Sequence, residues 1–389
     1  MKKTKYNIIF LILIVVILLQ SNSQSIAKAQ SLIELNSPSA ILIDAGTGKV
    51  LFEKNVNEKL EPASITKIMT LLLAFEAVDQ GKANLSDVVK ISERAWKTGG
   101  SQVFLGMGEE QTLETLLKCI TIASANDASV AVAEYLGGSV EGFVKMMNEK
   151  AKNLGMKNTH FVNPHGLSDP DHYTTAYDIA LMSRELVKYP KYFEWSTIWM
   201  DSLEHTDKDR EPTMLANTNK LMGKYEGLDG LKTGFHRKAG YCFAGTAKRG
   251  DFRLISVVLN AENSKQRFED TTKLLDYGFG NYNSLKIVER GSVCKKIPVE
   301  KGSVKQVDII ASDDLSILTQ KGIKQNITQK VELPDKLYAP IGENQKIGKL
   351  IVVENGKTIG QVDLIVSHEI KKASIFEIFK RTLSQWLNF

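Results

Sequence analysis

Three short polar segments, spread over about 170 residues, constrain what this chain can fold into. They are Ser64-Ile65-Thr66-Lys67, Ser124-Ala125-Asn126 and Lys232-Thr233-Gly234. Each is common by chance, but together they offer a nucleophile, an amine base, a proton relay and a grip for a carboxylate. The fold therefore has to bring three distant parts of the chain to one place, as an acyl-transfer site requires.

The first segment opens a stretch that predicts a buried helix. Residues 65–78 are rich in Leu, Met and Ala, so Ser64 would lie in the first turn, where free N–H groups favour developing negative charge. Lys67 would share a face with Ser64. Lysine can take the serine proton only if burial or another cation lowers its pKa, and Lys232 is the candidate cation. By itself Ser64 is more typical of a helix N-cap; the two partner segments favour the nucleophile.

The other two segments supply polar groups for a substrate. Ser124 can pass a proton between Lys67 and a leaving amine, and Asn126 can hold a substrate amide through its donor and acceptor. As isolated residues, both are equally typical of a turn. Lys232-Thr233-Gly234 precedes a predicted strand at 241–247, and a small residue there would let a substrate backbone lie along the strand edge.

The remaining pattern predicts two folded parts. The first would be one sheet covered by helices, from a β-hairpin at 39–44 and 50–53, a strand at 253–259, and helices at 113–122, 128–135, 140–154 and 175–187. The second would be a small all-β domain, from strands at 286–288, 293–298, 306–311, 329–333 and 349–353, with a hairpin turn at Asn355-Gly356 before a strand at 358–366. We place the parts at 30–283 and 284–368.

Both ends of the chain carry other signals. Lysines, an apolar run at 8–19 and Ala27-Lys28-Ala29 predict a signal peptide at 1–29. The alternative is an uncleaved anchor, although a run of about 12 residues is short for a bilayer. Residues 374–389, within a terminal segment at 369–389, form an amphipathic pattern that predicts a helix in a membrane interface. The alternative is a helix docked on the β-rich domain.

Composition argues against several function classes. The net charge of +5 is modest and no basic tract is interleaved with aromatic residues, so nucleic acid is not an expected partner. The cysteines are Cys119, Cys242 and Cys294, too few and too far apart for a disulfide framework. The histidines form no zinc motif, so we expect no metal and no cofactor.

Longer segments carry a more specific signal. Residues 62–70, 158–167 and 227–234, together with Ala239-Gly240-Tyr241, resemble the low-molecular-mass penicillin-binding proteins, which are serine-type D-alanyl-D-alanine carboxypeptidases. The chain is similar to the subfamily typified by penicillin-binding protein 5 and the sporulation-type carboxypeptidases, over nearly its whole length. The resemblance implies an α/β catalytic domain of the β-lactamase and transpeptidase type, with an antiparallel sheet covered by helices, followed by a small all-β domain.

The resemblance also implies roles by position. The catalytic residues would be Ser64, Lys67 and Ser124, and the substrate-binding residues would be Asn126, Lys232, Thr233, Gly234 and Arg267. The oxyanion hole would be the backbone N–H groups of Ser64 and His236. One departure is that Phe235 stands directly after Gly234, where the enteric relative has histidine. Arg267 could instead be an ordinary surface arginine on a helix.

The implied reaction has two steps on one serine. Ser64 would attack the bond between the last two D-alanines of a peptidoglycan stem peptide, and water would hydrolyse the acyl-enzyme. β-Lactam antibiotics would acylate the same serine. The enzyme would be exported and held at the outer face of the cytoplasmic membrane. Two alternatives remain: a β-lactamase, whose class A members use a glutamate as the deacylation base, and a non-catalytic penicillin- or wall-binding module.

Overall fold

The computed structural model of the protein describes residues 33–207, 209–323, 325–376 and 379. The predicted signal peptide lies outside these residues. So does most of the predicted C-terminal helix, of which Ser374, Ile375, Phe376 and Phe379 are described.

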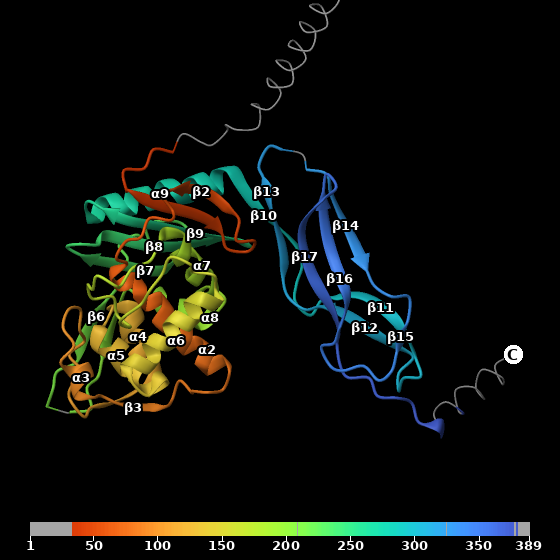
Figure 1. The fold of residues 1–389 in the computed structure, drawn as a ribbon, viewed down its shortest axis with the longest axis horizontal. Coiled ribbons are helices and arrows are strands. Elements are labelled where there is room, and N and C mark those ends of the chain that lie inside the picture. The colour runs from red at the N-terminus through yellow and green to blue at the C-terminus, as the bar shows by residue number, and fades with distance from the viewer. Residues whose placement is uncertain (1–32, 208, 324, 377–378, 380–389) are drawn as a thin grey trace, which may run out of the picture. The chain divides into compact units, whose positions relative to one another are not determined.

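An antiparallel five-stranded sheet organises the first part of the chain (Figure 1), with the strand order β2-β1-β9-β8-β7. Its strands are β1 (Ser39–Asp44), β2 (Val50–Lys54), β7 (Leu228–His236), β8 (Gly240–Arg249) and β9 (Phe252–Ala261). The predicted hairpin between β1 and β2 is confirmed, and β7 is an edge strand. Two small ribbons accompany the sheet: β3 (Val88–Lys90) with β4 (Glu110–Thr112), and β5 (Met200–Leu203) with β6 (Thr213–Ala216).

Helices cover both faces of this sheet (Figure 1). Helix α9 (Ser264–Asn281) packs on β8 and β9 from one side, and α2 (Lys67–Asp79) and α7 (Ala176–Leu186) belong to the layer on the other. The remaining helices are α3 (Glu93–Trp96), α4 (Leu113–Ile122), α5 (Asn126–Gly137), α6 (Val140–Asn153) and α8 (Pro190–Ser196). The four helices predicted between residues 113 and 187 are confirmed as α4 to α7, whereas the sequence pattern did not predict α9.

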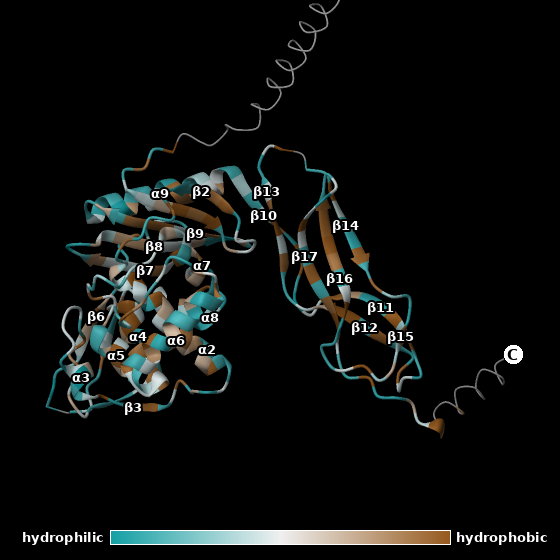
Figure 2. Ribbon diagram, viewed as in Figure 1, coloured by the Kyte–Doolittle hydropathy of each residue, from teal (hydrophilic) through white to brown (hydrophobic). Residues whose placement is uncertain are grey.

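Helix α2 is the centre of the hydrophobic core. All of its residues from Lys67 to Phe75 are buried, because the sequence carries no polar stripe that could face water. A 3₁₀ turn, η1 (Ala63–Thr66), leads directly into α2, so Ser64 lies in that turn rather than in the first turn of the α-helix itself. Hydrophobic residues likewise fill the central strands of the sheet (Figure 2).

The sequence analysis missed one strand of the sheet. The predicted strand at 241–247 is confirmed as β8, but Lys232, Thr233 and Gly234, which precede it, themselves lie within β7 and pair antiparallel with β8 from Lys232↔Ala244 to Gly234↔Cys242. The run Leu-Asp-Gly-Leu-Lys-Thr-Gly has two glycines and two charges, so it lacks the apolar, β-branched character by which strands are recognised. Cross-strand pairing and burial of the edge override this weak local preference.

The second part of the chain is all-β (Figure 1). Its six-stranded sheet has the order β14-β16-β17-β12-β11-β15, and β10 pairs separately with β13. The strands are β10 (Tyr282–Val288), β11 (Val293–Glu300), β12 (Gln306–Ala311), β13 (Leu315–Gln320), β14 (Ile327–Glu332), β15 (Leu337–Tyr338), β16 (Lys346–Glu354) and β17 (Lys357–Val366). The predicted Asn355-Gly356 hairpin turn is confirmed, with both residues at positive φ.

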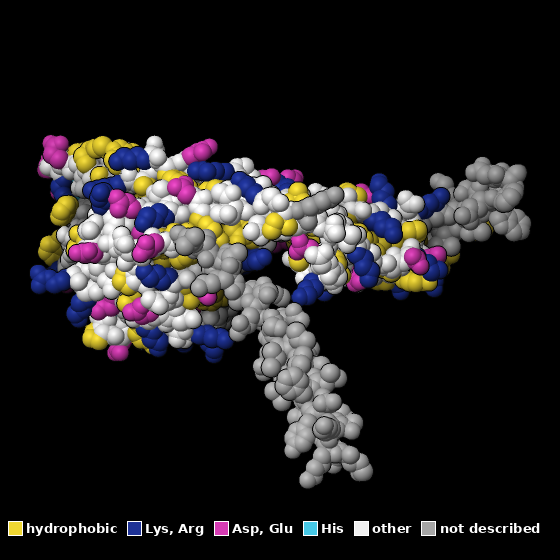
Figure 3. Space-filling model, turned by 90° about the horizontal axis from the view of Figure 1, so that it is seen from above, with side chains coloured by type: hydrophobic (Ala, Val, Ile, Leu, Met, Phe, Trp, Pro, Cys, Tyr) yellow, Lys and Arg dark blue, Asp and Glu magenta, His cyan; other side chains and the backbone are white. Residues whose placement is uncertain are grey.

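Residues beyond β17 still belong to this β-rich part. Ile370 is fully buried in its core and bridges to Ile341, and Ala373 donates to the carbonyl of Lys301. Basic and acidic side chains are interspersed over the face of the molecule seen in Figure 3, so that face presents no continuous basic surface.

Candidate active site

The amine of Lys67 is the meeting point of three segments. Its Nζ lies 3.0 Å from Ser64 Oγ, 2.6 Å from Asn126 Oδ1 and 2.8 Å from the carbonyl oxygen of His165. Ser64 comes from η1, Asn126 from the start of α5, and His165 from the loop before α7. The structure therefore brings together three of the residues predicted for the site and adds one carbonyl.

The partners of Lys67 suit a neutral amine. The oxygens of Asn126 and His165 can only accept, so they occupy two N–H donors, and the third direction faces a hydroxyl that can donate its own proton. Burial lowers the pKa of Lys67 well below its ordinary value of 10.5, and the charge of Lys232 lowers it further, whereas Asp127 opposes the shift. A neutral Lys67 would accept the proton of Ser64.

Asn126 is held in the orientation that this pairing needs. Its Nδ2 donates to the carbonyl of Gly99 at 2.7 Å, and its backbone N–H donates to the carbonyl of Ser101 at 2.8 Å. Because Nδ2 faces a carbonyl, Oδ1 faces Lys67. The segment that begins at Gly99 thus orients a group in contact with the amine.

Ser124 has an uncommon backbone and an unused hydroxyl. Its φ is +64°, in the left-handed region that costs a non-glycine residue about 1–2 kcal/mol. The residue is buried, and its Oγ makes no hydrogen bond. A buried hydroxyl normally has a hydrogen-bond partner. The hydroxyl of Ser124 is therefore free to bond a ligand or to relay a proton.

The third segment adds buried positive charge and a close backbone approach. Burial lowers the pKa of Lys232 to about 7, and Arg267 lowers it as well. A Cβ at Gly234 would lie 2.8 Å from the carbonyl oxygen of Pro62 and 3.2 Å from Cβ of Ala63, so only glycine lets β7 lie this close to η1. The Oγ1 of Thr233 donates to Thr218 Oγ1 at 2.6 Å.

Arg267 is buried, so the alternative of an ordinary surface arginine is wrong. Its Nη1 donates to the carbonyl oxygens of Gly234 at 3.0 Å and Cys242 at 3.1 Å. Its guanidinium lies over the ring of Tyr241 at 5.3 Å, and its Nε is buried without a hydrogen-bond partner. Burial of Arg267 lowers its pKa to about 10.

These two hydrogen bonds also fix which backbone groups of β7 face outward. Opposed residues of an antiparallel pair either exchange hydrogen bonds or point their N–H and C=O groups away from each other. One nitrogen reaches the carbonyls of Gly234 and Cys242 only if both point between the strands, so this is a hydrogen-bonded pair. By alternation the N–H of Phe235 faces the open edge and that of His236 faces β8, which favours Phe235 over the predicted His236.

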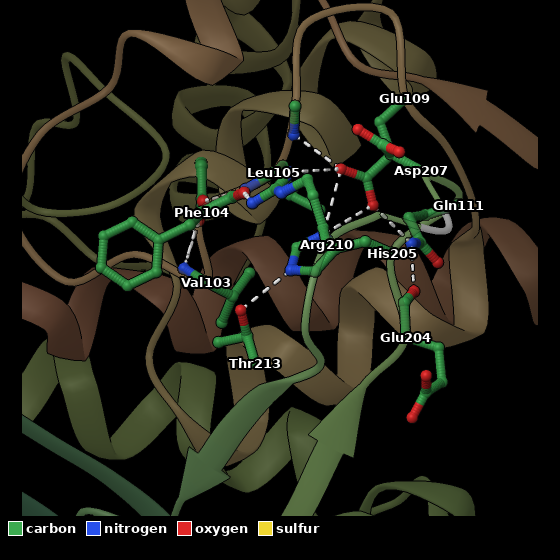
Figure 4. Close-up of polar contacts among 12 residues, drawn as sticks. Val103, Phe104, Leu105, Glu109, Gln111, Glu204, His205, Asp207, Arg210 and Thr213 are labelled. Carbon is green, nitrogen blue, oxygen red and sulfur yellow. Dashed lines mark hydrogen bonds and ion pairs between the residues drawn. The ribbon is translucent and has the colours of Figure 1, made fainter.

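Two buried carboxylates hold the segment at 99–106. Asp127 accepts from the N–H groups of Val103 and Leu105 at 3.1 and 3.2 Å, and Glu109 accepts from Gly106 at 2.6 Å. Arg210 donates to the carbonyl of Phe104 at 2.5 Å and lies 3.3 Å from Glu109 (Figure 4).

Glu109 is also fixed by one neighbour from the β5–β6 connection and one from β4. His205 Nδ1, from that connection, lies 3.0 Å from Glu109 Oε1, and the amide of Gln111, on β4, donates to the same oxygen at 2.7 Å (Figure 4). Burial raises the pKa of Glu109, but hydrogen bonds from Gly106, Gln111 and His205 outweigh it and hold that pKa below its ordinary value. An anionic Glu109 thus anchors the 99–106 segment, and through Gly99 it supports Asn126.

Sequence reasoning missed the backbone carbonyls of the site. The carbonyl oxygen of Gly99 accepts from Asn126, and that of His165 contacts Lys67. Every residue has a carbonyl group, so no sequence pattern points to these two. Gly166 is a recognisable signal: its φ is +87°, and a Cβ there would lie 1.9 Å from the carbonyl oxygen of Ala63. Among the described residues, no group of His, Cys, Asp and Glu is arranged to hold a metal ion.

Comparisons with known proteins identify the family that the chain resembles. Residues 24–263 match the family described as D-alanyl-D-alanine carboxypeptidase (peptidase S11), and residues 282–372 match the C-terminal domain of penicillin-binding protein 5. The chain is 44% identical to the D-alanyl-D-alanine carboxypeptidase DacF of Bacillus subtilis (strain 168), over 93% of each protein.

Solved structures give the same picture. Penicillin-binding protein 5 from Haemophilus influenzae has a TM-score of 0.70 and 31% identity, covering 88% of this chain and 99% of that one. Penicillin-binding protein D2 from Listeria monocytogenes, in its ampicillin-bound form, has a TM-score of 0.57 and 32% identity, covering 64% of this chain and 100% of that one.

The anchoring of the 99–106 segment predicts the effect of Arg210→Ala. The change removes a charge-assisted hydrogen bond to Phe104, which contributes about 1.5–3 kcal/mol. Amide hydrogen exchange at Val103, Leu105 and Gly106 should accelerate by about tenfold or more, with little effect on α2. Arg94→Ala is the control, because its ion pair with Glu141 is exposed. Unchanged exchange in the Arg210 variant would contradict the anchoring.

Proposed function

Because this chain belongs to the peptidase S11 family of D-alanyl-D-alanine carboxypeptidases, we propose that Ser64 is its acylated nucleophile and that Lys67 is the base. The protein is a serine hydrolase of the penicillin-binding protein 5 type, acts on peptides that end in D-alanyl-D-alanine, and binds penicillin. The observation that carries the assignment is the 3.0 Å contact between Lys67 Nζ and Ser64 Oγ, within a set of partners that suits a neutral amine.

Acylation begins with transfer of one proton. Neutral Lys67 accepts the proton of Ser64 Oγ as that oxygen attacks the carbonyl carbon between the two terminal D-alanines. The carbonyl becomes a tetrahedral oxyanion, stabilised by the backbone N–H groups of Ser64 and Phe235. When the C–N bond breaks, D-alanine leaves with a proton from Lys67, relayed by the unpartnered hydroxyl of Ser124. Water then hydrolyses the ester and restores the serine.

The substrate carboxylate supplies charge that the site lacks. Lys232 and Arg267 are buried, and burial lowers the pKa of both side chains. Keeping these two groups charged therefore costs desolvation free energy. A C-terminal carboxylate beside Lys232, Thr233 and the Nε of Arg267 would offset that cost through charge-assisted hydrogen bonds. Asn126 and the outward groups of β7 would hold the peptide backbone, in the manner of an added strand.

A β-lactamase is not favoured. Rapid deacylation in class A enzymes uses a glutamate with a bound water. The acid whose charge acts on Lys67 is Asp127, and its carboxylate is occupied by the backbone amides of Val103, Leu105 and Ala128. The all-β second part also has a counterpart in penicillin-binding protein 5.

We also propose that the enzyme is exported and works at the outer surface of the cytoplasmic membrane. The lysines and apolar run within residues 1–29 support cleavage by signal peptidase. Ile375, Phe376 and Phe379 are exposed large apolar side chains, which supports an interfacial role for the terminal segment. In the described part of the chain, no helix has the length and apolarity to cross a bilayer. The β-rich domain would then act as a spacer.

Ser64→Ala tests the assignment directly. The variant should fold as the wild type does but lose covalent labelling by penicillin, and release of D-alanine from a diacetyl-Lys-D-Ala-D-Ala peptide should fall by about 10³-fold or more. Intact mass and peptide mapping locate the acyl group. Ser129→Ala, which changes a buried serine bonded to its own helix, is the control. Persistent labelling of the Ser64 variant would overturn the assignment.

The contact between Asn126 and Lys67 predicts a pH effect. In Asn126→Asp a carboxylate would face Nζ, favour the ammonium and raise the pKa of Lys67. Because the base must be neutral, the acid limb of the acylation rate should move to higher pH. Asn126→Ala also weakens substrate binding but adds no charge, so its limb should not move upward. Equal pH profiles for the two variants would argue against Lys67 as the base.

The terminal segment is tested by truncation after Ala373. This boundary keeps Ile370 in the core of the β-rich domain. The shortened protein should be active and recovered in the soluble fraction, whereas the full chain should bind vesicles, more strongly with anionic lipid. Retention of the truncated protein in the membrane fraction would point to an uncleaved N-terminal anchor. Loss of folding would favour a docked helix instead.

A further inference from the structure

The two proposed oxyanion donors lie on different elements that meet along one seam. The seam consists of residues 61–64, leading into η1, and residues 234–236 at the end of β7. At one end, Gly234 packs so closely on Pro62 and Ala63 that no side chain would fit. The distance between the Ser64 and Phe235 N–H groups therefore depends on how this seam is held.

The other end of the seam is closed by an acidic and a basic side chain. Glu61 Oε2 lies 3.4 Å from His236 Nε2, and both atoms are buried without a hydrogen bond to any other group. Each of the two atoms thus lacks a hydrogen-bond partner and faces the other. Lys238 also approaches Glu61, at 4.0 Å, but its side chain is 66% exposed, so that contact is screened by water.

The proton of His236 is directed at Glu61. The N–H of Ala239 donates to His236 Nδ1 at 3.1 Å, so Nδ1 is an acceptor and the neutral ring carries its proton on Nε2. Burial lowers the pKa of His236, which favours this neutral form, although Glu61 opposes the shift. The same hydrogen bond also braces the turn between β7 and β8.

We infer that Glu61 and His236 are positioning residues for the oxyanion hole, because their contact joins the chain three residues before Ser64 to the chain one residue after Phe235. This inference rests on the proposed function of Ser64. With Gly234 at the opposite end, the pair brackets both donor N–H groups and keeps them aimed at one point. The pair touches no reacting atom, so its effect passes through the backbone.

Disrupting the pair should lower catalytic activity much more than it lowers the stability of the fold. The two side chains add little apolar burial, so the melting temperature of Glu61→Ala should change little, whereas His236→Ala also loses the hydrogen bond from the N–H of Ala239. A displacement of donors by a fraction of an ångström would still weaken binding of the tetrahedral state, where misplacement by about 1 Å can cost about 10²-fold. Removing an oxyanion donor outright costs about 10²–10³-fold, which sets the upper limit.

The experiment compares Glu61→Ala, His236→Ala and the double variant in the full chain. Each single change should lower kcat/KM by about tenfold, and the double variant should be no worse than the singles. Affinity for a peptide boronic acid, whose adduct with serine is tetrahedral, should fall by the same factor. Affinity for a non-hydrolysable peptide ending in D-alanine should stay within about twofold, because it does not load the oxyanion hole.

Two further variants serve as controls. Glu61→Gln keeps an acceptor for Nε2 and should retain most of the activity, and Lys238→Ala should match the wild type. Additive losses, or equal losses for the boronic acid and the ground-state peptide, would overturn the inference. If an alanine variant unfolds at too low a temperature to be assayed, the affinity of Glu61→Gln for the boronic acid still tests the inference. A tenfold loss of that affinity would contradict it. Failure of the proposed function would look different, since wild type itself would then bind no boronic acid at Ser64.

Discussion

The buried amine of Lys67 is the interaction on which the arrangement of the site depends. A charged amine without a counter-ion is costly to bury, and the chain meets this cost by surrounding Nζ with oxygens from three separate segments. The same environment favours the neutral form that can take a proton. Stability and reactivity here have one cause, since the oxygens that make burial tolerable also leave a lone pair facing the serine.

Each segment that reaches Lys67 does so through unusual backbone geometry. Ala63 and Ser124 have φ values of +50° and +64°, and Gly166 has +87°. Conformations of this kind persist only where surrounding contacts over-determine them. Such contacts are present here. The hydroxyl of Thr66 donates to the carbonyl of Ala63 and is hydrogen-bonded to Nε2 of His172. The carboxylate of Asp127, on α5, accepts from the backbone N–H of Val103. Polar groups that look merely structural therefore hold the reacting atoms in place.

The sequence predicted the parts of the fold whose signal is local. Helices α4 to α7 and the β1–β2 hairpin follow from periodicity and turn residues, and Ser64, Lys67 and Asn126 were placed together on chemical grounds. Two features depend on long-range pairing and could not be read this way. Lys232 lies within a strand because β8 pairs with it. Whether the backbone N–H of Phe235 or that of His236 faces the open edge depends on the register of that pairing, which the identity of the two side chains does not specify.

Burial of α2 on all sides has a consequence for how the enzyme fails. A helix in the middle of a core opens only when the whole domain unfolds, whereas a segment held by a few polar contacts opens locally. Lys67 on α2 therefore lies in a region that opens only with global unfolding, whereas the 99–106 segment lies in one that opens locally. Local openings of that segment leave the amine seated, and they reverse once its carbonyl contacts re-form. Lasting inactivation by heat thus coincides with loss of the domain itself, which makes catalysis a reporter of global folding.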